Sequence, residues 1–158
     1  MIQLKSLLTC IDNSGASIVE CVNVLKKKRP ATIGESPQTR VMGEEPNGEW
    51  RQSNSLGNRL GDRIVVVVQK SKPAGSEAPT SSALANKVRR GDIRHAVVVR
   101  VKKELQRPDG SVVRFGDNAC VLVNKSGDPV GTRMNGLVGQ ELRKRQYSKI
   151  LSLAPMHV

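Results

Sequence analysis

Apolar and β-branched residues gather in several short stretches of the chain between turn-forming and loop-like segments, and such stretches are typical of β-strands. The pattern predicts strands over residues 2–10, 17–25, 63–70, 93–103, 111–115 and 119–124. Turn-forming residues occupy 12–15 and 108–110, and Asn, Asp and Gly tolerate the backbone angles of tight turns. We therefore expect a mainly β fold in which consecutive strands pair antiparallel.

Residues 139–148 have a different composition, because Glu, Leu, Arg, Lys and Gln there favour helix. One or two short helices should therefore cap the strands. Aromatic residues make up only 2% of the chain, so the core must consist of Val, Ile and Leu. Short strands of this kind curl into a small barrel more readily than they build a large two-sheet sandwich.

Two segments rich in Gly, Pro and Ser interrupt the strand pattern, at residues 30–60 and 71–85. The first also contains more Glu than Arg and no Lys. Such composition predicts long loops rather than core elements. With 158 residues, the chain is expected to form a single domain over 1–158 that carries these two insertions.

The net charge of the chain indicates which class of molecule it binds. Lys and Arg number 26 against 14 Asp and Glu, a net charge of +12, and most of the excess follows Ala85. A charge of this sign favours a polyanion as partner. Because aromatic residues are scarce, an aromatic platform that stacks single-stranded bases is nearly excluded, and contact with phosphates remains.

The predicted strand 93–103 concentrates this charge. Alternation places on one face Ile93, His95, Val97, Val99 and Val101, and on the other Arg94, Arg100 and Lys102. Together with flanking cations these make the predicted phosphate-binding surface: Lys87, Arg89, Arg90, Arg94, Arg100, Lys102, Lys103, Arg107 and Arg114. Ordinary solvated surface charge is the alternative. Only Asp92, Glu104 and Asp109 compensate in this stretch, which favours the binding surface.

Enzymatic alternatives have weaker support. Asp12, Asp62 and Asp92 could form a metal-dependent hydrolytic cluster, but each sits beside Gly or Asn in a turn, where carboxylates commonly bind the backbone. A structure that places them in separate turns would remove this hypothesis. His95 lies on an apolar strand face, so we expect a buried, hydrogen-bonded histidine and assign it no catalysis.

No cofactor motif, structural zinc site or disulfide framework is predicted. The cysteines Cys10, Cys21 and Cys120 are odd in number and lack a CxxC pair, which indicates a reducing compartment. The longest run of strong hydrophobes, residues 64–68, is far shorter than the roughly 20 residues that span a bilayer. We therefore expect no membrane partner.

Several motifs, in this order and spacing, are those of one family. They are MIQ at 1–3, DNSGA at 12–16, GD at 61–62, VRRGD at 88–92, AVVVR at 96–100, RPDGS at 107–111, FGDNACVL at 115–122, GTR at 131–133, ELR at 141–143 and KILSLAP at 149–155. The sequence strongly resembles the universal large-subunit ribosomal protein L-fourteen in its bacterial and organellar form. The resemblance spans nearly the whole chain.

The resemblance implies a closed five-stranded β-barrel with a projecting hairpin and short C-terminal helices, and a job without catalysis or cofactor. It implies binding to large-subunit rRNA, contact with small-subunit rRNA through intersubunit bridges, and contact with neighbouring large-subunit ribosomal proteins. It further implies a C-terminal surface for a ribosome-silencing factor, at the matching positions Thr132, Arg133, Lys149 and Ser152. A free-standing small-barrel regulator that binds RNA or DNA is the remaining non-enzymatic alternative.

The two insertions depart from the compact bacterial pattern and are similar to the expansions of mitochondrial ribosomal proteins. The implied location is therefore the mitochondrial matrix, in the large ribosomal subunit. Because a net-negative segment is repelled by phosphate, we expect the insertion at 30–60 to contact protein or solvent rather than RNA.

Overall fold

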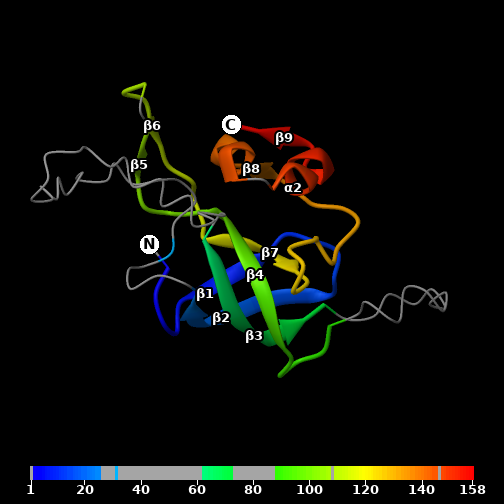
Figure 1. Ribbon diagram of the computed structural model, residues 1–158. Helices are drawn as coiled ribbons and strands as arrows, with labels where there is room; N and C mark the ends of the chain where they lie inside the picture. The colour runs from blue at the N-terminus through cyan, green and yellow to red at the C-terminus, as the bar shows by residue number, and fades with distance from the viewer. Residues whose placement is uncertain (1, 26–30, 32–61, 73–87, 108, 146) are drawn as a thin grey trace, which may run out of the picture.

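Five strands form a closed barrel in the order β1-β2-β3-β4-β7 (Figure 1). The barrel closes where β1 pairs with β7. The computed structural model describes residues 2–25, 31, 62–72, 88–107, 109–145 and 147–158. The barrel strands are β1 (Leu7–Cys10), β2 (Ala16–Val24), β3 (Arg63–Ser71), β4 (Ile93–Arg100) and β7 (Ala119–Val123). Neighbours are antiparallel except β1 and β7, which are parallel. The expected mainly β, five-stranded barrel is confirmed.

A separate two-stranded hairpin extends from the end of β4, as Figure 1 shows. It consists of β5 (Leu105–Gln106) and β6 (Val112–Val113). The Arg107 N–H donates to the Ser111 carbonyl at 2.8 Å, and Gly110 takes a φ of +85°, which suits glycine. The predicted hairpin turn is therefore confirmed. Consecutive pairing of every strand was wrong, because β4 pairs with β7 and the hairpin strands pair only with each other.

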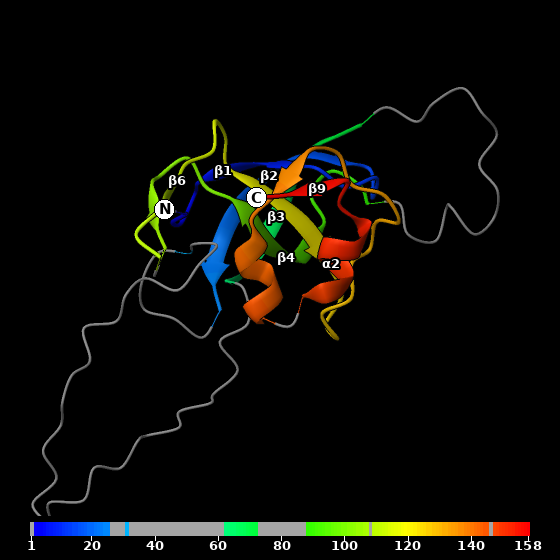
Figure 2. The same cartoon turned by 90° about the horizontal axis from the view of Figure 1, so that it is seen from above.

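The C-terminal segment forms a small layer of its own. It contains β8 (Leu137–Val138), a 3₁₀ helix η1 (Gln140–Arg145), the α-helix α2 (Ser148–Leu153) and β9 (Met156–His157). Figures 1 and 2 show these elements together beside the barrel, coloured orange to red. Val138, Leu142 and Ile150 are fully buried in this layer. The expected short helices are present, and α2 extends beyond the predicted range.

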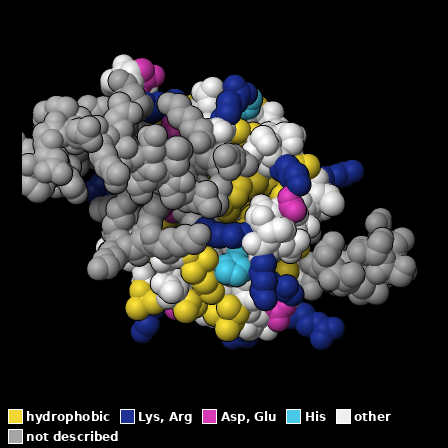
Figure 3. All heavy atoms as spheres, viewed as in Figure 1, with side chains coloured by type: hydrophobic (Ala, Val, Ile, Leu, Met, Phe, Trp, Pro, Cys, Tyr) yellow, Lys and Arg dark blue, Asp and Glu magenta, His cyan; other side chains and the backbone are white. Residues whose placement is uncertain are grey.

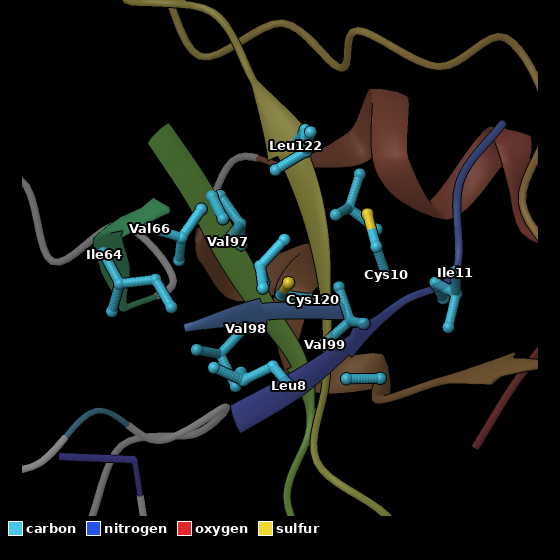
Figure 4. Packing of buried hydrophobic residues seen from close by; sticks show 14 of the residues in the cluster. Leu8, Cys10, Ile11, Ile64, Val66, Val97, Val98, Val99, Cys120 and Leu122 are labelled. Atoms are coloured by element: carbon cyan, nitrogen blue, oxygen red, sulfur yellow. The ribbon is translucent and has the colours of Figure 1, made fainter. Parts of the chain in front are cut away.

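Aliphatic side chains fill the barrel, as the shortage of aromatic residues predicts. In β3 the buried residues Ile64, Val66 and Val68 alternate with half-buried neighbours. Figure 4 shows such side chains from β1, β3, β4 and β7 packed against one another. Every residue of β7 is buried, so this strand is covered on both faces: one side faces the barrel interior, and the other lies under the C-terminal layer.

Strand ends differ from the sequence predictions for local reasons. The strand predicted over 2–10 begins only at Leu7, because Lys5 has a φ of +63° that ends any extended run. The strand predicted over 93–103 ends at Arg100, after a register shift between Val98 and Arg100. Residues after this bulge do not follow the predicted alternation.

The two predicted insertions, 30–60 and 71–85, lie outside the described residues except for Ala31, Ser71 and Lys72. Ala31 is buried and pairs with Ile2 through 2.8 and 2.9 Å backbone hydrogen bonds, so the first insertion begins against the barrel's N-terminal segment. Among the described residues, no helix combines the length and apolar character that crossing a membrane requires.

Candidate nucleic-acid interface

The turn before β4 presents two arginines on a fixed backbone. The Asp92 N–H donates to the Arg89 carbonyl at 3.2 Å, and the Asp92 carboxylate accepts from the Arg89 N–H at 3.2 Å. Gly91 has a φ of +89° and donates its N–H to the Val68 carbonyl of β3 at 2.8 Å. Arg89 and Arg90 are both exposed, and neither side chain has an ion pair with any described residue.

Arg94 lies beside this turn but not on the predicted face. Residues directly opposite each other in a sheet share a face, and Arg94 is opposite Val66, which is fully buried. Arg94 therefore belongs to the face that points into the barrel, at its open end, where the side chain reaches solvent and lies 3.6 Å from Asp92. The prediction of a basic outer face on this strand was wrong.

The apolar face of the strand points outward instead. Ile93 and His95 are opposite Val67 and Val65, the half-buried outer residues of β3. Ile93 is 68% exposed, whereas Val97 on the same face is fully buried. Burial starts at Val97 because the C-terminal layer covers the barrel from there; the Gly139 N–H, for example, donates to the Val99 carbonyl at 3.2 Å.

Two predicted RNA-binding arginines are used inside the protein. Arg100 donates to Asp117 at 3.0 Å, with only 16% of its side chain exposed. Arg107 pairs with Glu141 and donates to the Val158 carbonyl at 2.7 Å, so it joins the hairpin to the C-terminal layer. The hydrogen bond to Glu141 is the main reason that the pKa of Arg107 is raised above its usual value.

The remaining cations gather at the hairpin end of β4. Lys102 and Lys103 are exposed and make no ion pair with a described residue, and Arg114 lies 3.9 Å from Glu104 in a loose, exposed pair. Lys87 lies outside the described residues. Figure 3 shows Lys and Arg side chains projecting at several places around the described part of one face.

The predicted cations therefore form two groups rather than one surface. We call Arg89, Arg90 and Arg94 the turn group, and Lys102, Lys103 and Arg114 the hairpin group. The two groups lie at opposite ends of β4, and a strand of eight residues spans roughly 25 Å. This distance is comparable to several nucleotides of an RNA backbone, so the two groups can contact different phosphates of one RNA.

A third cationic cluster was missed by the sequence analysis. Arg63, at the start of β3, donates from Nη2 to the carbonyls of Asn124 and Lys125 at 2.7 and 3.0 Å. These bonds bring the loop after β7 beside His95. Burial lowers the pKa of the His95 imidazole below its usual value, and the positive charges of Arg63 and Lys125 lower it further.

His95 itself differs from the expectation of a buried, hydrogen-bonded residue. It is only half-buried, and its Nδ1 has no hydrogen-bond partner among the described residues. The sequence could not indicate this cluster, because Arg63 and Lys125 are far apart in the chain and meet only through the pairing of β3, β4 and β7.

Two of the three carboxylates in the hydrolase hypothesis, those of Asp12 and Asp92, accept backbone hydrogen bonds. Asp12 is buried and accepts hydrogen bonds from the Ser14 N–H at 3.1 Å and the Leu122 N–H at 2.9 Å. Asp62 precedes β3, whereas Lys72 beyond the other end of β3 donates to the Asp12 carbonyl at 3.1 Å. Asp12 and Asp62 therefore lie at opposite ends of a long strand, and the described residues contain no cluster suited to a metal ion.

The cysteines are buried within the fold. Cys10 and Cys120 are opposite each other in the parallel β1–β7 pair, and all three cysteine thiols are free. The hydrogen bond with Cys10, together with burial, raises the pKa of the Cys120 thiol well above its usual value. These thiols are therefore packing groups rather than nucleophiles.

The four C-terminal positions Thr132, Arg133, Lys149 and Ser152 are all exposed. Asn13 holds the first two: its Oδ1 accepts the N–H of Thr132 at 2.8 Å and that of Arg133 at 3.2 Å. Lys149 donates to Asp128 at 2.5 Å, and this bond is the main reason that the pKa of Asp128 is below its usual value. Residues 128–133 thus link the N-terminal turn to α2.

The sequence matches the family model described as ribosomal protein L14p/L23e over residues 1–158. A protein of Neurospora crassa named large ribosomal subunit protein uL14m is 56% identical over 156 residues, covering 99% of this chain and 98% of its own length. The protein of the same name from Schizosaccharomyces pombe is 44% identical over 155 residues, covering 98% of each chain. With these matches along its whole length and the barrel that they accompany, the chain belongs to the ribosomal protein L14p/L23e family.

Proposed function

We propose that this chain, a structural and non-enzymatic constituent of the mitochondrial large ribosomal subunit, binds large-subunit rRNA electrostatically through the turn group and the hairpin group. Lys and Arg side chains at the two ends of β4 contact RNA phosphates and release their counterions. The barrel holds the two groups at a fixed separation, so that the protein selects an RNA shape rather than a base sequence.

The observation that carries this proposal is the contrast between two kinds of arginine. Arg100 and Arg107 are neutralised by Asp117 and Glu141 within the protein. Arg89 and Arg90 are exposed on a rigid turn and have no acidic partner among the described residues. Unpaired cations on an ordered backbone bind a polyanion with little further loss of backbone conformational entropy.

The experiment compares salt-dependent release of variants from the assembled subunit. Cells that lack their own copy express the wild-type chain or the double variant Arg89→Ala, Arg90→Ala. Mitochondrial large subunits are then washed at increasing salt, and the protein that stays bound is measured by mass spectrometry. We expect the variant to leave at lower salt, with a log–log slope smaller by about one for each lost phosphate contact.

A matched control keeps both positive charges at the same positions. The variant Arg89→Lys, Arg90→Lys should be released nearly like the wild-type chain, because lysine also binds phosphate. If the double alanine variant also behaves like the wild type, the turn group does not bind rRNA.

The family resemblance carries two finer proposals about the C-terminal layer. The same protein contacts small-subunit rRNA across the intersubunit interface, and the exposed residues Thr132, Arg133, Lys149 and Ser152 receive a ribosome-silencing factor. Their exposure supports this use. If Arg133→Ala leaves capture of such a factor by purified large subunits unchanged, this surface is not the binding site.

A further inference from the structure

Three side chains that carry positive charge or an N–H donor come together on the outer surface of the barrel, on the other face of β4 from Arg94. Arg63 belongs to β3, His95 to β4 and Lys125 to the loop after β7. His95 is opposite Val65 in one strand pair and opposite Val123 in the other, so it lies between the strands that carry Arg63 and the loop.

Hydrogen bonds hold the cluster in a fixed geometry. Arg63 Nη2 makes two hydrogen bonds to backbone carbonyls, at 2.7 and 3.0 Å, which fix the guanidinium and the loop together. The Nε of Arg63 and the Nδ1 of His95 are both buried without a partner among the described residues. Because these two atoms are buried, an acceptor from another molecule can meet only the other nitrogens of the two side chains.

No described acid neutralises the cluster. Asp128, in the same loop as Lys125, is occupied by Lys149 and Ser126. The charged groups that face His95 are Arg63 and Lys125, and both disfavour its protonation. Like charges held this close together destabilise the isolated protein, and an anion at the site would offset that cost.

We propose that Arg63, His95 and Lys125 form a further anion site that receives an rRNA backbone phosphate. The inference rests on the proposed rRNA binding and adds a contact to it. Arg63 and Lys125 supply positive charge, and neutral His95 supplies an N–H donor from its Nε2 edge, because its Nδ1 is buried without a partner. A phosphodiester is favoured as the anion because the chain is proposed to bind rRNA, and its two non-bridging oxygens can accept from separate donors.

The test uses a variant that leaves the Arg63 hydrogen bonds in place. The double variant His95→Gln, Lys125→Gln removes one charge and one imidazole, and neither side chain makes a hydrogen bond to a described residue. In the salt-release assay on assembled mitochondrial large subunits, we expect release at lower salt and a slope smaller by about one. Lys125→Arg, which keeps the positive charge, should be released like the wild type.

The outcomes separate this inference from the proposed function. If Arg89→Ala, Arg90→Ala lowers the release salt and His95→Gln, Lys125→Gln does not, the further site is wrong and the turn group remains. If neither variant has an effect, rRNA binding by either site fails. Lys125, whose carbonyl accepts from Arg63, lies at the opposite end of β3 from Val68, which holds the turn of Arg89 and Arg90. The two losses should therefore add when the variants are combined.

A second measurement identifies the occupant. A carbodiimide joins a lysine amine to a carboxylate at contact distance but does not join it to a phosphodiester. In wild-type subunits we expect Lys125 to form no such cross-link to a neighbouring protein, and ultraviolet cross-linking to attach RNA to the segment that contains Lys125. A carbodiimide cross-link from Lys125 to an acidic protein segment would overturn the proposal.

Discussion

Asp12 and Leu122 join the two strands that close the barrel: the Asp12 Oδ2 accepts the Leu122 N–H at 2.9 Å. The same carboxylate accepts the Ser14 N–H at 3.1 Å and the Cys10 S–H at 3.1 Å. The β1–β7 pair has only two residue pairs in register, so a buried side chain supplies part of the connection that a longer strand pair would supply through its backbone.

Asp12→Asn should therefore destabilise the fold. The amide nitrogen would face one of the N–H donors and leave it without an acceptor in a buried place, at a cost of about 2–3 kcal/mol. Chemical denaturation of the purified chain measures the loss. Asp109→Asn is the control, because Asp109 is exposed and accepts only from Ser111 in the hairpin turn. Equal stability of the two variants would contradict the role given to Asp12.

Gly131→Ala should displace the loop that carries Thr132 and Arg133. A Cβ at Gly131 would lie 2.8 Å from the Asp12 Cβ and 2.9 Å from the Asn13 Oδ1, closer than van der Waals contact permits. We expect a destabilisation of about 1–3 kcal/mol, together with a change in backbone amide chemical shifts of residues 131–133.

Gly116→Ala is the matched control for Gly131→Ala, because nothing lies within 4 Å of a Cβ at Gly116. Its stability and the amide shifts of the 131–133 loop should match those of the wild type. A tolerated Gly131→Ala with unchanged shifts would show that the loop is not held against the N-terminal turn.

Arg107→Gln should reduce stability without a direct loss of RNA affinity. It leaves Glu141, only 14% exposed, without its ionic partner and removes the bond to the Val158 carbonyl. The expected cost is about 1–3 kcal/mol, seen as a lower denaturation midpoint. Arg89→Ala should leave that midpoint unchanged, since Arg89 makes no side-chain contact with a described acid. A lower midpoint for Arg89→Ala, together with an unchanged midpoint for Arg107→Gln, would contradict the roles assigned to the two arginines.

Stability should decrease as the pH falls below about 6.5, the pKa of an unperturbed histidine. The pKa of His95 is lowered in the folded chain by burial, and then by Arg63 and Lys125. The unfolded chain therefore takes up a proton first, which favours unfolding between pH 6.5 and the lower folded-state pKa. Denaturation at a series of pH values measures the slope, and His95→Gln should flatten it. If the slope of stability against pH is the same in His95→Gln as in the wild type, a group other than His95 causes the pH dependence.

Local patterns in the sequence predicted the local features of the fold. The short apolar, β-branched runs within 63–70 and 119–124 identified β3 and β7, and the turn residues at 108–110 identified the hairpin, because neighbouring residues determine these features. The faces of β4 could not be predicted in this way. Val97 is buried on the outside of the barrel by the distant C-terminal layer, so alternation alone could not say which face was the interior.

Prediction of the binding residues met the same limit. Counting cations could not separate Arg100 and Arg107 from Arg89, because their partners Asp117 and Glu141 become neighbours only in the folded chain. The cluster around His95 was missed because its members belong to three separate segments. Charge composition indicated the class of partner, whereas the pairing of strands decides which cations remain available for it.

The most direct test of the account is the distribution of this chain across a sucrose gradient of mitochondrial lysate, measured by mass spectrometry before and after a high-salt wash. The account predicts that the wild-type chain sediments with the large subunit in fixed proportion to its other proteins and survives the wash. It also predicts that the Arg89→Ala, Arg90→Ala variant is partly released. A wild-type chain that stays at the top of the gradient would contradict a role as a constituent of the subunit.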